Sequence, residues 1–123
     1  MGLFDTVSDA KIKSGDCTDI YFVRTEEVLK KEGINPLVSM EVTAAALPDT
    51  WGIFCGLADV LALLEGVPVT VDAMKEGTLF FAGEPVLRIT GHYRDFCRYE
   101  TAILGFLCHA SGIASATAHI MCE

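Results

Sequence analysis

Two acidic residues lie among apolar neighbours in the second half of the chain, where a carboxylate can do chemistry. Glu100 is expected on an apolar helix, and Glu76 stands in a glycine-rich stretch. A carboxylate in such surroundings caps a helix, pairs with an arginine or works in a site. The candidate partners of Glu100 are Arg88, Arg94 and Arg98. The sequence leaves both an ion pair and a site role open for it.

The histidines and cysteines offer weaker candidates for chemistry. His92, His109 and His119 lie at least ten positions apart, so no two of them share a helix face as adjacent metal ligands would, and a structural role is expected for each. Cys108 precedes His109 directly, but helical neighbours point about 100° apart and cannot form a nucleophile and base pair. Asp95, just before a long apolar helix, is expected to cap it.

Tyr21 is a candidate for contact with a planar ligand, because it stands near the start of a predicted helix beside Asp19 and Arg24. The competing interpretation is that an aromatic residue on a helix belongs to the core. Glycine-rich phosphate loops, Walker sequences, H-E-x-x-H motifs and nucleophile elbows are not found in the sequence. The residues therefore predict no catalytic group and no metal site.

The helix that carries Tyr21 is predicted from its cap and its charge spacing. Thr18 is a candidate N-cap. Glu26 with Lys30, and Glu27 with Lys31, place an acid four positions before a base, which stabilises an exposed helix face.

The remaining elements alternate between strands and helices. Apolar spacing of two predicts strands, and spacing of three and four predicts helices. The Ser111-Gly112 pair is expected to break the last helical stretch in two. The predicted helices are 8–13, 18–31, 57–65, 95–110 and 113–122, and the predicted strands are 37–43, 69–71, 79–81 and 86–89.

Composition narrows the classes of function. The chain has 123 residues, 51% of them hydrophobic and 21% charged, with a net charge of −8, so a nucleic-acid groove is not expected. No stretch reaches about 18 uninterrupted apolar residues and no leader is seen, which predicts a cytoplasmic chain without membrane contact. Five cysteines without a C-x-x-C pair indicate reduced thiols.

These patterns predict an α+β fold in two parts. Residues 1–93 form a mixed strand and helix domain, and residues 94–123 begin a helical one. The last helix has no stop signal, so we expect the chain to be the front part of a longer protein.

Three stretches together resemble one family. They are residues 19–25, residues 76–78 with 83–87, and residues 95–107 with 110–114, in the family's order and spacing. The chain resembles the archaeal-type nicotinate phosphoribosyltransferases of the type II phosphoribosyltransferase superfamily. The resemblance implies an α/β sandwich domain beside an incomplete α/β barrel, of which this chain supplies the sandwich's first part and the barrel's leading helices.

The resemblance also implies an activity. Family members are transferases that make nicotinate mononucleotide from nicotinate and phosphoribosyl pyrophosphate in NAD salvage, with ATP hydrolysis and Mg²⁺. Asp19 and Tyr21 match a motif that reaches into the neighbouring subunit's site, where the tyrosine stacks on the pyridine ring and Arg24 helps to orient it. At least a homodimer is therefore implied. The histidine that ATP phosphorylates lies beyond Glu123 in family sequence, so this chain alone is expected to be inactive.

Other functions remain open. Quinolinate phosphoribosyltransferases also resemble residues 100–114, but they carry arginine directly after the glutamate, where this chain has Thr101. Nicotinamide stays possible because the groups that recognise a carboxylate would come mostly from elsewhere. A non-catalytic module that oligomerises through its apolar surface is the remaining alternative.

Overall fold

A three-stranded antiparallel sheet in the order β1-β5-β3 forms one layer of the fold. The structure, a computed structural model, describes residues 9–15, 18 and 20–122. The strands are β1 (Leu37–Thr43), β5 (Pro85–His92) and β3 (Thr70–Ala73). β5 lies in the centre, with Met40 and Val71 both opposite Ile89.

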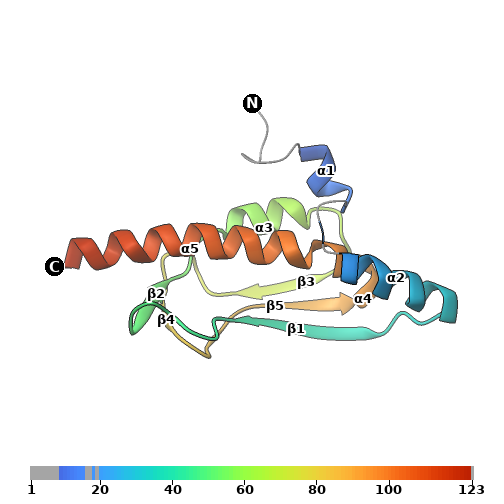
Figure 1. The fold of residues 1–123 in the computed structure, drawn as a ribbon, viewed down its shortest axis with the longest axis horizontal. Coiled ribbons are helices and arrows are strands. Elements are labelled where there is room, and N and C mark those ends of the chain that lie inside the picture. Colours follow the sequence, from blue (N-terminus) through green and yellow to red (C-terminus); the bar gives the residue numbers. More distant parts are fainter. Residues whose placement is uncertain (1–8, 16–17, 19, 123) are drawn as a thin grey trace.

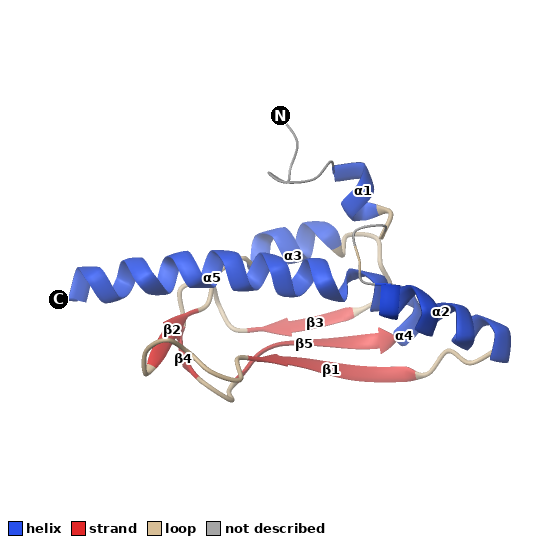
Figure 2. Ribbon diagram, viewed as in Figure 1, coloured by secondary structure: helices blue, strands red, loops and turns tan. Residues whose placement is uncertain are grey.

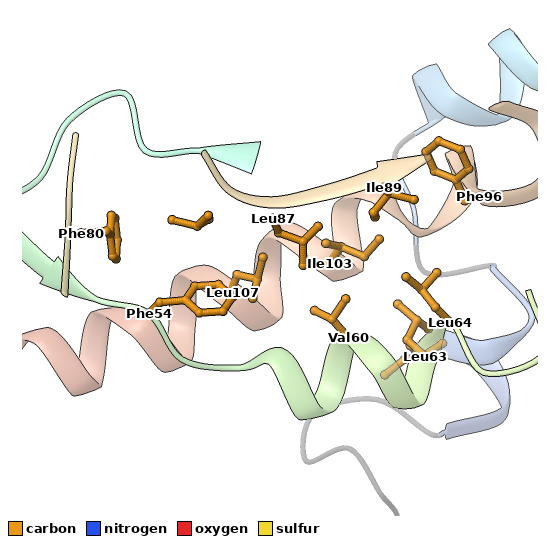
Figure 3. Packing of buried hydrophobic residues seen from close by; sticks show 12 residues of the cluster. Phe54, Val60, Leu63, Leu64, Phe80, Leu87, Ile89, Phe96, Ile103 and Leu107 are labelled. Atoms are coloured by element: carbon orange, nitrogen blue, oxygen red, sulfur yellow. The ribbon is translucent and has the colours of Figure 1, made fainter. Parts of the chain in front are cut away.

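Two helices form the second layer, as Figure 2 shows. These are α5 (Glu100–Cys122), which runs along the sheet, and α3 (Leu57–Leu63) beside it. Their apolar faces and the inner face of the sheet enclose the core (Figure 3). Its fully buried side chains are Phe54, Phe96, Leu87, Ile89, Ile103, Val60 and Cys97.

The outer face of the sheet is polar, because the alternation of each strand puts its polar residues on that side. Arg88 of β5 forms an ion pair with Glu41 of β1 and lies opposite Asp72 of β3. One step along the sheet, the hydroxyls of Ser39 and Thr90 are 3.2 Å apart and share a hydrogen bond.

A second, two-stranded sheet pairs β2 (Trp51–Ile53) with β4 (Leu79–Phe81). Side chains of α5 accept hydrogen bonds from backbone amides on the other edge of β2 and just beyond it. Ser115 Oγ accepts from the Ile53 amide at 2.8 Å, and Ser111 Oγ accepts from the Cys55 amide at 2.9 Å. Four residues of a helix span about 6 Å and two residues of an extended chain span about 6.6 Å. The spacing of Ser111 and Ser115 therefore matches the spacing of the Ile53 and Cys55 amides.

The second of the two amino-terminal helices lies at the end of the sheet where β5 finishes, and the first lies above the helical layer near the same end (Figure 1). They are α1 (Asp9–Lys13) and α2 (Ile20–Glu32), and the turn after β5 consists of α4 (Tyr93–Phe96) and a 3-10 turn, η1 (Cys97–Tyr99). Glu26 of α2 is buried, with 6% of its surface exposed, and it forms ion pairs with Arg98 of η1 and with Lys30.

The α+β class is confirmed, and three local predictions are wrong. α5 is continuous through Ser111 and Gly112, because the Ser111 hydroxyl bonds to Cys55 rather than competing with the helix. β2 was not predicted, since it is short and is defined by its partner β4. Asp95 lies inside α4, whose N-cap position is His92, so Asp95 does not cap a helix. The domain boundary at residues 93 and 94 stays a prediction.

One helical stretch has the length and composition of a membrane span. It is Tyr93–Cys122, and only 11% of its apolar window is buried. The expectation that no stretch resembles a membrane span rested on counting uninterrupted apolar residues. This stretch meets the criterion by its mean hydropathy instead.

Candidate functional site

The first turn of α2 presents the site residues that the sequence singled out. Tyr21 is 69% exposed, and its ring lies edge-on to Phe22 with the centroids 5.5 Å apart. Arg24 is exposed one turn further along the helix. Asp19 lies outside the described residues. The structure thus puts the Tyr21 ring on the surface and not in the core.

Half-buried titratable groups adjoin this surface. Burial raises the pKa of Tyr93, and the neighbouring groups Cys97, Glu100 and Tyr21 add to the rise when charged. Burial also raises the pKa of the Glu100 carboxyl. Tyr93 therefore lies within electrostatic range of Tyr21 on α2 and of Glu100 at the start of α5.

The arginines do not neutralise Glu100 as the sequence suggested. Arg88 pairs with Glu41, and Arg98 pairs with Glu26. The Nε of Arg94 is buried and has no hydrogen-bond partner in the described part of the chain. Within that same part Glu100 has no ion pair, so of the two roles left open for it the ion pair is not observed. The buried ion pair belongs to Glu26 instead.

Glu76 has a structural role. Its Oε1 accepts hydrogen bonds from the amides of Gly56 at 3.0 Å and Leu57 at 2.7 Å, at the start of α3. Of the three roles the sequence left open for such a carboxylate, capping is the one observed.

A groove lies at the opposite end of the molecule from α2 (Figure 1), between residues 44–51, which lead from β1 into β2, and α5. Its volume is about 570 Å³, and its floor consists of core residues, among them Phe54, Phe80 and Leu107. At its mouth the His119 ring stacks on Trp51 with the centroids 3.7 Å apart. Neither Tyr21 nor Arg24 lines the groove. The groove forms between segments far apart in the chain, so no local pattern in the sequence predicts it.

The other candidates are separate from one another. His92 Nδ1 lies 3.0 Å from the Asn35 carbonyl, and His119 Nε2 lies 3.0 Å from the Trp51 carbonyl. These contacts agree with structural roles. Cys108 and His109 are both exposed. The described ranges, 9–15, 18 and 20–122, contain no group of three His, Cys, Asp or Glu side chains that could hold a metal ion.

Comparison with known families decides the membership of this chain. The family model of the quinolinate phosphoribosyl transferase N-terminal domain matches residues 19–111. The chain belongs to this family. The match spans α2, both sheets and the first half of α5, so it includes Tyr21, Glu100 and one wall of the groove. Membership in the type II phosphoribosyltransferase superfamily is thereby established.

Solved structures of the superfamily share the fold. Nicotinate-nucleotide pyrophosphorylase from Pyrococcus furiosus is 48% identical, with a TM-score of 0.87 over 94% of this chain and 30% of that protein. Human nicotinic acid phosphoribosyltransferase, 24% identical, matches with a TM-score of 0.69 over 82% of this chain and 27% of that one. The human structure supports the fold alone.

A shorter match comes from a curated enzyme. Nicotinate phosphoribosyltransferase pncB1 from Mycobacterium tuberculosis is 37% identical over 51 residues, which are 42% of this chain and 11% of that enzyme. This chain therefore spans only a small part of the relatives that it matches.

Proposed function

We propose that this chain is the amino-terminal portion of a nicotinate phosphoribosyltransferase, which joins nicotinate to phosphoribosyl pyrophosphate in NAD biosynthesis. The observation that carries the choice is Thr101, which follows Glu100 in the first turn of α5. The quinolinate enzymes that this stretch resembles carry arginine there. A threonine hydroxyl cannot form the two parallel hydrogen bonds by which a guanidinium holds a second carboxylate.

Quinolinate phosphoribosyltransferase is the second candidate, because the matching family model describes that enzyme. The name of the Pyrococcus furiosus relative fits both candidates, since both reactions form nicotinate nucleotide and pyrophosphate. The name of the Mycobacterium tuberculosis relative favours nicotinate.

Tyr21 is proposed to stack on the pyridine ring. Its exposure leaves the ring available to a ligand or to a neighbouring subunit. A flat heteroaromatic gains dispersion and quadrupole contacts from an offset aromatic ring, and this contact would hold the ring nitrogen toward the sugar's anomeric carbon. Arg24, and Asp19 by resemblance, would orient the ligand. Because the resemblance gives these residues to a neighbouring subunit's site, the proposed enzyme is at least a dimer.

The proposed reaction also involves Mg²⁺ and ATP. Within the described residues no acidic cluster fits a Mg²⁺ ion, so we expect both groups on the remaining polypeptide. That polypeptide would stabilise the charge that develops as pyrophosphate leaves. Because this chain lacks that polypeptide, we expect it alone to be inactive, both in the cytoplasm and in a purified assay.

The test compares two substrates in the full-length enzyme that carries this sequence. We expect kcat/KM to favour nicotinate over quinolinate, and Thr101→Arg to raise quinolinate use. Tyr21→Ala should lower kcat/KM for nicotinate about 5- to 150-fold, the worth of one stacking contact, while Tyr21→Phe keeps most of it. A preference for quinolinate would replace the proposal by the second candidate. An unchanged kcat/KM in Tyr21→Ala would remove Tyr21 from the site.

A further inference from the structure

Glu100 is a half-buried carboxyl for which the described part of the chain provides no counter-charge. Burial raises its pKa, and no arginine or lysine among residues 9–15, 18 and 20–122 forms an ion pair with it. Arg98, two positions before it, is paired with Glu26 instead. Moving a carboxylate partly out of water without a partner costs free energy. Groups that stay in such a state are concentrated in functional sites.

Tyr93 relates the position of Glu100 to that of the proposed pyridine site. Tyr93 lies within electrostatic range of Glu100 at the start of α5 and of Tyr21 on α2. Its ring lies edge-on to the buried Phe96 with the centroids 6.0 Å apart, and its backbone amide donates to the Pro36 carbonyl at 2.9 Å. α2, α4 and the start of α5 lie at the same end of the molecule (Figure 1). Glu100 and Tyr21 are therefore both neighbours of one well-anchored residue at this end.

The proposed reaction creates a positive charge on the pyridine ring. The lone pair of the ring nitrogen forms a bond to the anomeric carbon, while the bond from that carbon to the pyrophosphate oxygen breaks and pyrophosphate leaves with the electron pair. The ring nitrogen is neutral before the attack and positively charged after it, and no proton has to move. A fixed carboxylate near the ring gains stabilisation as this charge grows, so it lowers the barrier more than it favours binding of the neutral ring.

We propose that the Glu100 carboxylate faces the pyridine ring at Tyr21 and stabilises the positive charge that forms on the ring nitrogen. An ion pair would cancel the charge of the carboxylate, so the lack of one among the described residues is what this role requires. The inference rests on the proposed function in one respect, the place of Tyr21 at the pyridine. It does not depend on which pyridine is used, because the quinolinate enzymes that residues 100–114 resemble also carry this glutamate and form the same charged ring.

The competing role for Glu100 is a structural ion pair with an arginine or lysine outside this chain. The two roles predict opposite effects on stability when the charge is removed. Breaking a buried ion pair leaves the partner's charge uncompensated and destabilises the protein. Neutralising an unpaired carboxylate removes a desolvation cost, so stability stays equal or rises.

The test uses the full-length enzyme that carries this sequence and the variant Glu100→Gln, which removes the charge at nearly constant size. We expect kcat to fall about tenfold or more while KM changes less than about threefold, because the charge acts mainly in the transition state. The melting temperature should stay equal or rise. Glu100→Asp keeps the charge and should retain more of kcat than Glu100→Gln. The matched control is Glu65→Gln, which removes the same charge at an exposed position after α3 and should leave kcat and KM unchanged.

A binding measurement separates the effect of charge from the effect of shape. Its two ligands are nicotinate mononucleotide, whose ring nitrogen is positively charged, and the analogue in which carbon replaces that nitrogen and the ring is neutral. We expect the wild-type enzyme to bind the charged ligand more tightly, and Glu100→Gln to reduce this preference about tenfold. A merely structural role would weaken both ligands equally.

Four outcomes of these measurements overturn the proposal: an unchanged kcat in Glu100→Gln, an effect on KM alone, equal weakening of the two mononucleotides, or a lower melting temperature, which would indicate the structural ion pair. An enzyme that prefers quinolinate, and in which Glu100→Gln still removes the preference for the charged mononucleotide, would refute the proposed function and leave this inference standing.

Discussion

Replacing Glu26 with glutamine is expected to lower the free energy of unfolding at pH 7 by about 1.5 to 3 kcal/mol, the worth of a hydrogen bond to a charged group. The Glu26 side chain is only 8% exposed and accepts a hydrogen bond from Arg98 Nε, while Lys30 Nζ lies 3.1 Å away. Lys30 is half exposed, so its contribution is screened and most of the loss comes from Arg98. The pair ties α2, and with it Tyr21, to η1.

The effect should depend on pH in a defined direction. Burial raises the pKa of Glu26, but the hydrogen bonds from Arg98 and Lys30 outweigh burial and hold the pKa below its usual value. A carboxyl with a depressed folded-state pKa contributes stability above its unfolded pKa of about 4.3, and loses it as the pH falls through the folded-state value. The difference between wild type and Glu26→Gln should therefore be full at pH 7 and shrink below about pH 4.

Urea unfolding followed by circular dichroism between pH 7 and pH 3 measures both effects. The matched control is Glu27→Gln, since Glu27 is exposed on the same helix and makes no ion pair in the described part of the chain. That change should stay within about 0.5 kcal/mol of wild type. Equal effects of the two substitutions, or a Glu26→Gln penalty that is constant from pH 7 to pH 3, would refute the reasoning.

Three further substitutions test the packing of the helices by the same urea titration. Ser115→Ala leaves a partly buried amide of β2 without its acceptor and should cost about 1 to 3 kcal/mol, whereas Thr117→Ala on the exposed side of α5 should cost little. Gly56→Ala would place Cβ 2.8 Å from a backbone oxygen of α5 at a φ of +101°, so it should cost more than Gly66→Ala, whose φ is +83° with no neighbour within 4 Å. Glu76→Ala removes the cap of α3 and should cost about 1 kcal/mol, and Glu76→Gln should restore part of it.

Each of these has an outcome that contradicts it. Equal losses of unfolding free energy for Ser115→Ala and Thr117→Ala would mean that the Ile53 amide donates to water once Ser115 is gone. Equal losses for the two glycine variants would mean that backbone conformation alone decides the cost. No loss on removing the Glu76 side chain would mean that the α3 amides are satisfied without it.

Local patterns predicted most of the elements, because periodicity reports directly on which face of an element is buried. The apolar spacing around Val60 identified α3, and the alternation around Met40 identified β1. The break expected at Ser111 and Gly112 failed because it relied on the intrinsic preferences of two residues. Those preferences are weak beside the hydrogen bonds between Ser111 and the backbone of Cys55, 56 positions away in sequence.

The site shows the same division between local and distant causes. The exposure of Tyr21 follows from its helix position, whereas Tyr93 is brought near it by the tertiary fold. Glu26 and Glu27 form identical charge pairs in sequence, and no local rule says which of the two is buried. Only the packing of α2 on η1 distinguishes them.

The hydrogen bonds from α5 to β2 also affect whether the chain aggregates. The outer edge of a strand is a template on which another extended chain can add, and this is a common route to aggregation. Ser115 accepts from the Ile53 amide at that edge and Ser111 from the Cys55 amide just beyond the strand, and these side chains of a helix cannot pass the pairing on to a further strand. The same contacts that position α5 thus protect a short, apolar strand from intermolecular β-pairing.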